Sequence, residues 1–187
     1  MMMRLVSLLA LSVSAAALNV TCVGDLDVAF KTGAASCGNS MQQGDVQSEP
    51  SVGFPGAEKS KLYLFVMVDP DACLGDTDPC QSWTPGTTAP PGKAAPVRHW
   101  VVGNVYGETL REGRMTTYAE VFTPFKGPAP PSGAHRYGFF VWEQQGEVAD
   151  PQFGDNRTAW DYEAFLREAK ISTPPVASNW IIVHHST

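Results

Sequence analysis

The stretch Gly127–Gln145, GPAPPSGAHRYGFFVWEQQ, carries the clearest structural pattern in this chain. Its first half is rich in proline and glycine, which is typical of a loop with a constrained path. Its second half predicts a buried strand over His135–Gln144, because large apolar residues occupy both alternating faces. One face carries His135, Tyr137, Phe139 and Val141, and the other carries Arg136, Phe140 and Trp142.

Two other segments are predicted to be buried strands that meet this one. Lys61–Asp69 is apolar at both alternating sets of positions, so we expect a central strand that is covered on both sides. It ends in the acidic sequence Asp69-Pro70-Asp71. Val97–Val105 is similar and carries His99. Acids and histidines at strand ends predict one polar pocket on a β-scaffold.

The remaining elements have weaker signals. Three more strands are predicted, at Leu26–Lys31, Tyr118–Thr123 and Asn179–His184. We expect a polar turn or hairpin over Glu108–Arg114 and a long loop over Ala72–Pro96. A single helix is predicted over Thr158–Lys170, with Thr158 and Asp161 as a variant capping box.

Composition favours one globular, β-rich domain. The chain has 187 residues, of which 43% are hydrophobic and 17% charged, with 17 glycines and 15 prolines for turns. We therefore predict a single domain over residues 18–187. The net charge of −6 and the lack of any basic run argue against a nucleic-acid partner.

Residues 1–17 have the pattern of a secretory signal peptide. A positive residue precedes the short apolar run Leu5–Leu11, and small residues follow at the expected cleavage site. That run is too short to span a membrane, although an uncleaved anchor is an alternative. We expect a secreted protein, with glycosylation sequons at Asn19 and Asn156.

The four cysteines follow the predicted signal peptide, so they would reach an oxidising compartment. Two disulfides are expected, and of three possible connectivities we favour the local pairs Cys22–Cys37 and Cys73–Cys80. A zinc site is the alternative, but no C-x-x-C spacing supports it.

Residue types alone leave the chemistry of the pocket open. Backbone N–H groups of a glycine-containing loop can converge on an anion, and an imidazole can add a donor. Asp69, His99 and His135 could instead ligate a metal, but no H-x-H or H-E-x-x-H spacing is present. A serine triad lacks a G-x-S-x-G elbow, and acid–base catalysis is unspecific. A binding pocket and a hydrolytic site are equally compatible with these residues.

The chain resembles the phosphatidylethanolamine-binding protein (PEBP) family, also called the Raf kinase inhibitor protein family. The segments that carry the resemblance, in order, are DPDA (69–72), HWVVGNV (99–105), GPAPPSGAHRY (127–137), FFVWEQ (139–144) and, more weakly, PPVASNW (174–180). The resemblance implies a mostly β fold, with a large central antiparallel sheet packed on a smaller sheet and few helices. We expect one helix, in the C-terminal region.

The resemblance also implies a small pocket that binds anions such as the phosphate of a phospholipid head group or of a phosphorylated partner. Carried over by position, the candidate ligand-binding residues are Asp69, Asp71, His99, Pro131, Gly133, His135 and Tyr137. The histidines and loop amides would face the anion. The two aspartates would orient the histidines or shape the loop, because like charges repel.

Several positions depart from the family pattern. Cys73 replaces a proline, the Pro131–His135 loop is shorter, and Val97 and Arg98 stand where an aromatic residue precedes the pocket histidine. A C-terminal helix that lines the animal pocket has no counterpart after Trp180, so a more open pocket is expected.

The resemblance implies a monomeric, non-catalytic binding protein without cofactor or metal. A phospholipid head group or other small phosphate-bearing ligand is the expected partner, and inhibition of a serine protease or signalling protein is a further role. The alternative is a metal- or histidine-dependent hydrolase that uses the same pocket.

Overall fold

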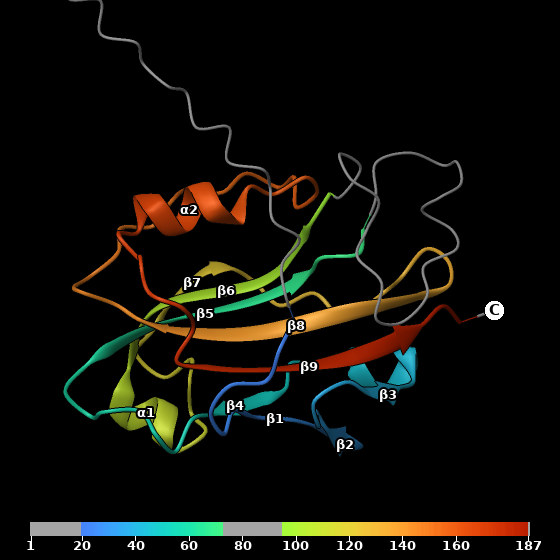
Figure 1. The fold of residues 1–187 in the computed structure, drawn as a ribbon, viewed down its shortest axis with the longest axis horizontal. Coiled ribbons are helices and arrows are strands. Elements are labelled where there is room, and N and C mark those ends of the chain that lie inside the picture. Colours follow the sequence, from blue (N-terminus) through green and yellow to red (C-terminus); the bar gives the residue numbers. More distant parts are fainter. Residues whose placement is uncertain (1–19, 73–94, 187) are drawn as a thin grey trace, which may run out of the picture.

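The computed structural model describes residues 20–72 and 95–186, and within them the chain forms two β-sheets and few helices (Figure 1). The elements are β1 (Asp27–Phe30), β2 (Gly33–Ala34), β3 (Asn39–Met41), η1 (Gln43–Val46), β4 (Ser51–Gly53), β5 (Leu62–Asp69), β6 (Val97–Tyr106), α1 (Gly107–Arg111), β7 (Glu120–Thr123), β8 (Ala134–Glu143), α2 (Tyr162–Glu168) and β9 (Ala177–His184). The strand order is β3-β9-β8-β5-β6-β7 in the large sheet and β2-β1-β4 in the small one.

The large sheet is antiparallel except for β3, which runs parallel to β9. Strand β5 lies at its centre between β6 and β8. As predicted, both faces of β5 are buried, because it sits between two apolar layers. The mostly β fold with a large sheet packed on a smaller one is confirmed.

One face of the large sheet packs on the small sheet and α1, and the other face packs on α2 (Figure 1). Tyr63, Phe65 and Met67 of β5 join the first layer with Val28 of β1 and Leu110 of α1. The second layer contains Leu64, Val66, Val68, Phe140, Trp142 and Phe165. The alternation in the sequence therefore assigned the side chains of β5 and β8 to the correct faces.

One local prediction was wrong, and another had the correct element with the wrong bounds. The segment predicted as a polar turn or hairpin at Glu108–Arg114 contains most of the short helix α1. The Leu110 side chain of α1 is buried in the same core cluster as the small sheet. The predicted helix over Thr158–Lys170 is shorter: α2 begins after Asp161, whose carboxylate accepts a hydrogen bond from the Ala164 N–H at 2.8 Å. Asp161 is thus the N-cap residue itself.

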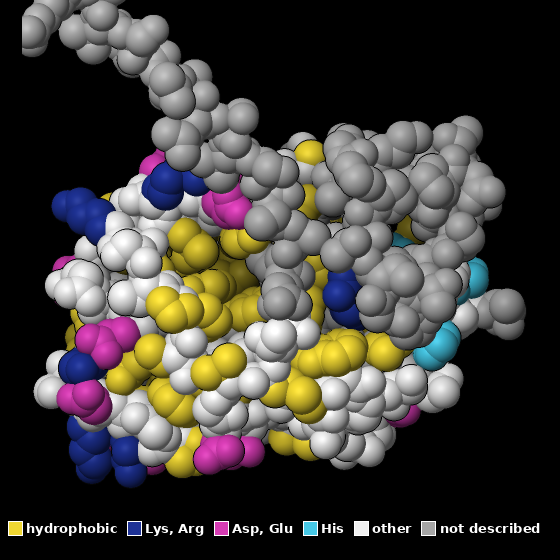
Figure 2. All heavy atoms as spheres, in the orientation of Figure 1, with side chains coloured by type: hydrophobic (Ala, Val, Ile, Leu, Met, Phe, Trp, Pro, Cys, Tyr) yellow, Lys and Arg dark blue, Asp and Glu magenta, His cyan; other side chains and the backbone are white. Residues whose placement is uncertain are grey.

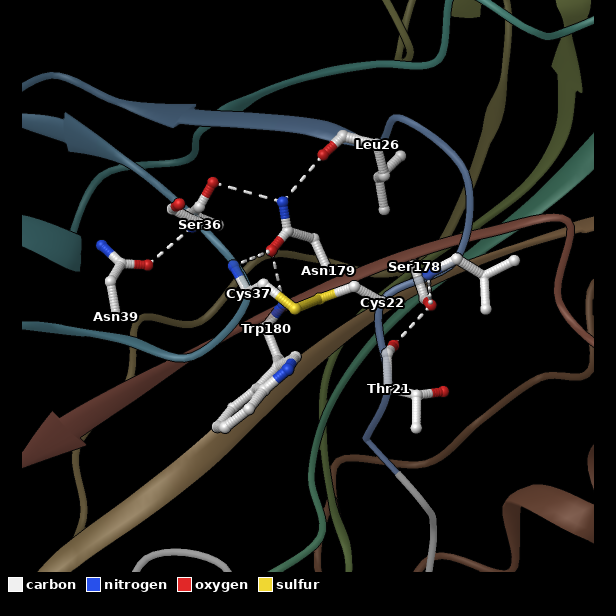
Figure 3. The surroundings of a disulfide bond; sticks show 11 residues. Thr21, Cys22, Leu26, Ser36, Cys37, Asn39, Ser178, Asn179 and Trp180 are labelled. Atoms are coloured by element: carbon white, nitrogen blue, oxygen red, sulfur yellow. Dashed lines mark hydrogen bonds between the residues drawn. A yellow bond between two sulfur atoms is a disulfide. The ribbon is translucent and has the colours of Figure 1, made fainter.

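The N-terminal end of the described chain is tied to β9. Val23 forms a bridge with Ser178, and the Ser178 hydroxyl donates to the Thr21 carbonyl (2.6 Å). The predicted disulfide Cys22–Cys37 is present beside these contacts (Figure 3). The predicted Cys73–Cys80 pair, the signal peptide and the Asn19 sequon lie outside the described residues.

Asn179 of β9 supplies the other half of this connection. Its side-chain N–H₂ donates to the carbonyls of Leu26 and Ala35, and its Oδ1 accepts from the Cys37 and Trp180 N–H groups (Figure 3). One amide therefore joins the segments around β1 and β2 to the large sheet. No helix in the described ranges is long and apolar enough to span a membrane.

Candidate functional site

The candidate site lies at the end of the large sheet where β5 and β9 end and β6 and β8 begin (Figure 1). Histidine side chains are visible at this end of the molecule in Figure 2. Of the residues predicted for the pocket, Asp69, Asp71, His99, His135 and Tyr137 are all buried here. Pro131 and Gly133 lie in the loop before β8 and are exposed.

His135 is held by Asp69 across the β5–β8 pair. The His135 Nδ1 atom lies 2.8 Å from Asp69 Oδ2, and the backbone N–H groups of Asp71 and Ala72 donate to Asp69 Oδ1. Burial, the largest influence, lowers the pKa of His135. The hydrogen bond and charge of Asp69, together with the charge of Asp71, outweigh burial, so the net pKa of His135 is raised. This arrangement favours the charged imidazolium.

His99 is aimed into the same layer by a β-bulge. Met67 pairs with Trp100 and Val68 pairs with Arg98, so His99 between them has no partner on β5. A bulge of this kind re-aims a side chain. The His99 ring consequently meets the Tyr137 ring edge-on, with centroids 5.1 Å apart, and its Nδ1 lies 2.7 Å from the Lys126 carbonyl oxygen.

The electrostatic setting of His99 is opposite to that of His135. Burial lowers its pKa, and the charges of Arg157 and Lys126 add to this effect. The Lys126 carbonyl and the Asp69 carboxylate raise the pKa of His99 but do not overcome burial. The two pocket histidines therefore differ in preferred charge, His99 towards neutral and His135 towards cationic.

Tyr137 lies two residues after His135 on β8, and its ring contacts the ring of His99. Its side chain is 1% exposed. Burial raises the pKa of Tyr137 far above its ordinary value, and the negative charge of the neighbouring Asp69 carboxylate raises it further. Tyr137 thus remains a neutral phenol, whose hydroxyl can donate a hydrogen bond.

Asp71 and Arg136 form a second, separate contact between β5 and β8. The Arg136 Nε and Nη2 atoms lie 2.9 and 2.6 Å from Asp71 Oδ2 and Oδ1, and the Arg136 backbone N–H also donates to Oδ2 (2.8 Å). The Asp71 side chain is fully buried. Because both carboxylate oxygens are engaged, Asp71 is placed to position β8 rather than to contact a ligand.

The loop before β8 is held by His185, which follows β9. The backbone N–H of His185 donates to the Gly133 carbonyl (2.8 Å), and His185 Nδ1 lies 3.0 Å from the Pro130 carbonyl. Gly133 has φ +62°, a left-handed conformation that glycine adopts without strain. The loop before β8 therefore gains a fixed path from residues after β9.

Three elements of the site were missed by sequence reasoning. These are Arg136 as the partner of Asp71, the Lys126 carbonyl that orients His99, and Arg157, whose side chain donates to the carbonyls of His99 and Pro124. Of these three, only Arg136 could have been found in the sequence. It directly follows His135 in a predicted buried strand, so its charged side chain lies on the opposite, apolar face and needs an acidic partner. Across the described ranges, no group of three His, Cys, Asp or Glu side chains is arranged to hold a metal ion, and this includes Asp69, His99 and His135.

The fold and site define a β-sheet domain with a buried pair of histidines at one end of its main sheet. The family model for phosphatidylethanolamine-binding protein matches residues 26–181. The chain therefore belongs to the phosphatidylethanolamine-binding protein family.

Known relatives agree with this assignment. A 26 kDa secreted antigen of Toxocara canis is 28% identical over 145 residues, which cover 74% of this chain; the chain spans about half (48%) of that relative's length. The structure of a phosphatidylethanolamine-binding protein from Plasmodium vivax superposes with a TM-score of 0.63 at 19% identity, covering 90% of this chain and 88% of the other.

A carboxypeptidase Y inhibitor, solved in complex with its cognate proteinase, also has this fold. It superposes with a TM-score of 0.60 at 21% identity, covering 86% of this chain and 83% of the inhibitor. At this low sequence identity, the superposition shows a shared fold alone.

Proposed function

We propose that this domain is a non-catalytic binding protein that holds a small phosphate-bearing group between His99 and His135. The observation that carries the proposal is the placement of two buried imidazoles at one end of the sheet, with Nδ1 of each ring engaged by the protein. In each case Nε2 is the ring nitrogen left for a ligand, and no residue of the described part hydrogen-bonds to it.

Charge favours an anion at this position. A cationic His135 can donate a charge-assisted hydrogen bond, which is stronger than a neutral one. Lys126 and Arg157 lie near His99 and add positive charge. Loop amides around Gly133 would supply further donors, as glycine-containing loops do at other anion sites. Asp69 and Asp71 do not contact the anion in this proposal. They position His135 and Arg136 through hydrogen bonds.

Calorimetric titration with phosphoethanolamine tests this proposal. Wild-type protein should bind it, and His135→Ala and His99→Ala should each weaken binding by about tenfold or more, because a charge-assisted or buried hydrogen bond is lost. His184→Ala is the matched control, since His184 is exposed on β9. Equal affinities in wild type and both pocket variants would refute the site.

Export of the protein is part of the same proposal. It is supported by the signal-like N-terminus, the Cys22–Cys37 disulfide and the secreted relative. Asn156 is exposed, and its Oδ1 accepts from the Thr158 hydroxyl (2.8 Å), so its amide nitrogen can receive a glycan. Mass spectrometry before and after enzymatic deglycosylation tests this site, and no mass change would contradict it.

Protease inhibition is a second candidate role, favoured by the carboxypeptidase Y inhibitor that shares the fold. Such inhibition would act through the protein surface. His135→Ala should then abolish phosphate binding and leave inhibition of a carboxypeptidase intact. Loss of both activities in that variant would count against a surface mechanism.

A further inference from the structure

The hydrogen bonds of the two pocket histidines assign them opposite roles toward a ligand. His99 Nδ1 lies 2.7 Å from the Lys126 carbonyl oxygen. A carbonyl oxygen can only accept, so the hydrogen is on Nδ1. In the neutral ring, Nε2 then carries a lone pair and can only accept a hydrogen bond.

The surroundings of His99 support the neutral ring. The side chain is 5% exposed, and burial disfavours its charged form. The charged groups around it are Asp69 from β5, Lys126 from the loop after β7 and Arg157 from the loop before α2. Two of these three charges are positive and oppose protonation. Tyr137 of β8 meets the ring edge-on and remains neutral.

His135 has the complementary role. Its Nδ1 donates to the Asp69 carboxylate at 2.8 Å, and both Asp69 and Asp71 favour the charged ring. In the imidazolium, Nε2 carries a hydrogen and can only donate. His99 and His135 stand on β6 and β8, which flank β5, so their backbones are about two strand spacings, or about 10 Å, apart. A tetrahedral phosphate can fit between two rings that extend from such positions.

We propose that this pocket selects phosphate groups that carry a hydrogen-bond donor of their own. An anionic oxygen would accept from His135, while a P–OH or an ammonium group would donate to His99. This inference rests on the proposed function. A ligand with acceptor oxygens only would set a lone pair against the lone pair of His99 Nε2, which lowers affinity.

Two kinds of ligand meet this requirement, and matched compounds distinguish them. Monomethyl phosphate carries a P–OH group when singly protonated, and phosphomonoesters have a second pKa of about 6. Methyl phosphoethanolamine is a diester whose only hydrogen-bond donor is the ammonium group, as in a lipid head group. Dimethyl phosphate is a monoanion of similar chemistry without any donor.

Calorimetry at about pH 6, where about half of the monoester is protonated, tests the inference. At least one donor-bearing ligand should bind about tenfold or more tightly than dimethyl phosphate, and which of them does identifies the donor. Equal binding of all three compounds would overturn the inference and leave the proposed function standing. No binding of any compound would overturn both.

A variant tests whether His99 is the source of the preference. The amide of His99→Gln offers an N–H donor as well as an acceptor, so the preference over dimethyl phosphate should fall to about threefold or less. His184→Gln, at the exposed histidine of β9, should keep the wild-type preference. A full preference in His99→Gln protein with an unchanged thermal transition would overturn the inference.

Discussion

Two regions hold the large sheet to its neighbours by different chemistry. At the pocket end, β5 and β8 are joined by the buried pairs Asp69–His135 and Asp71–Arg136. Towards the start of β9, the Cys22–Cys37 disulfide and the Asn179 amide hold the N-terminal segments. The first region depends on ionisation and the second on a covalent bond. Protonation should therefore alter the pocket, whereas loss of the disulfide should alter stability and leave the pocket intact.

The two aspartates at the pocket end have different proposed roles, Asp69 in ligand binding and Asp71 in stability. Asp69 and Asp71 are two residues apart, yet Asp69 engages His135, which faces the Tyr137 layer, and Asp71 engages Arg136 on the opposite face of β8. Successive residues of a strand point to opposite faces, which separates His135 from Arg136 on β8. Asp71 lies beyond the end of β5, so the alternation of that strand does not hold it on the face of Asp69, and it reaches Arg136.

The largest effect is expected from Asp71→Ala. Removing this carboxylate breaks the buried Asp71–Arg136 ion pair, a change that typically costs about 3–5 kcal/mol. Urea denaturation measures the loss. Glu112→Ala is the matched control, because Glu112 pairs with Arg114 on the surface and such exposed pairs contribute little. Similar midpoints for the two variants would contradict a structural role for the Asp71–Arg136 pair.

A smaller loss of stability is expected when Cys22 and Cys37 are both changed to serine. The bond closes a loop of 15 residues, for which loop-closure entropy predicts about 3 kcal/mol. Phosphoethanolamine affinity should stay within about twofold of wild type once the protein is folded, because the histidine contacts do not involve this segment. A larger loss of affinity would show that the two regions are coupled.

The smallest effect concerns pH. His135 has a raised pKa in the folded protein, so its stabilising contribution is complete below about pH 6.5 and is lost as the pH rises through the folded value. His99 has a lowered pKa, so its contribution is present above about pH 6.5 and is lost as the pH falls towards the folded value.

Unfolding free energies at several pH values separate these opposite contributions. His135→Gln should flatten the decline above about pH 6.5, and His99→Gln should flatten the decline below it. His184→Gln serves as the control. An unchanged slope in both pocket variants would contradict the assigned charge states.

Long apolar strands were predictable from the sequence because their alternation is strong. The faces of β5 and β8 and the Cys22–Cys37 pair were assigned correctly. The short strands β2, β3 and β4 were not predicted, because they have only two or three residues and little alternation. Helix α1 was taken for a turn because its five residues span barely more than one turn.

In the site, the sequence indicated which residue types gather but not how they contact one another. Asp69, His99 and His135 were identified by motif. The bulge that turns His99 inward depends on the register between β5 and β6, which no local pattern reveals. The contact of His99 with the Lys126 carbonyl likewise joins residues 27 positions apart. Tertiary pairing therefore determines the hydrogen-bond partners of the two rings, and with them the proposed ligand preference.

Ring-nitrogen NMR during a phosphoethanolamine titration can follow the proposed binding between His99 and His135 residue by residue, because the chain has only four histidines. The ring signals of His99 and His135 should shift together and saturate at one affinity, while those of the exposed His184 stay nearly fixed. Before ligand is added, His99 should show the neutral form protonated at Nδ1. Saturable binding that leaves the His99 and His135 rings unchanged would contradict the account.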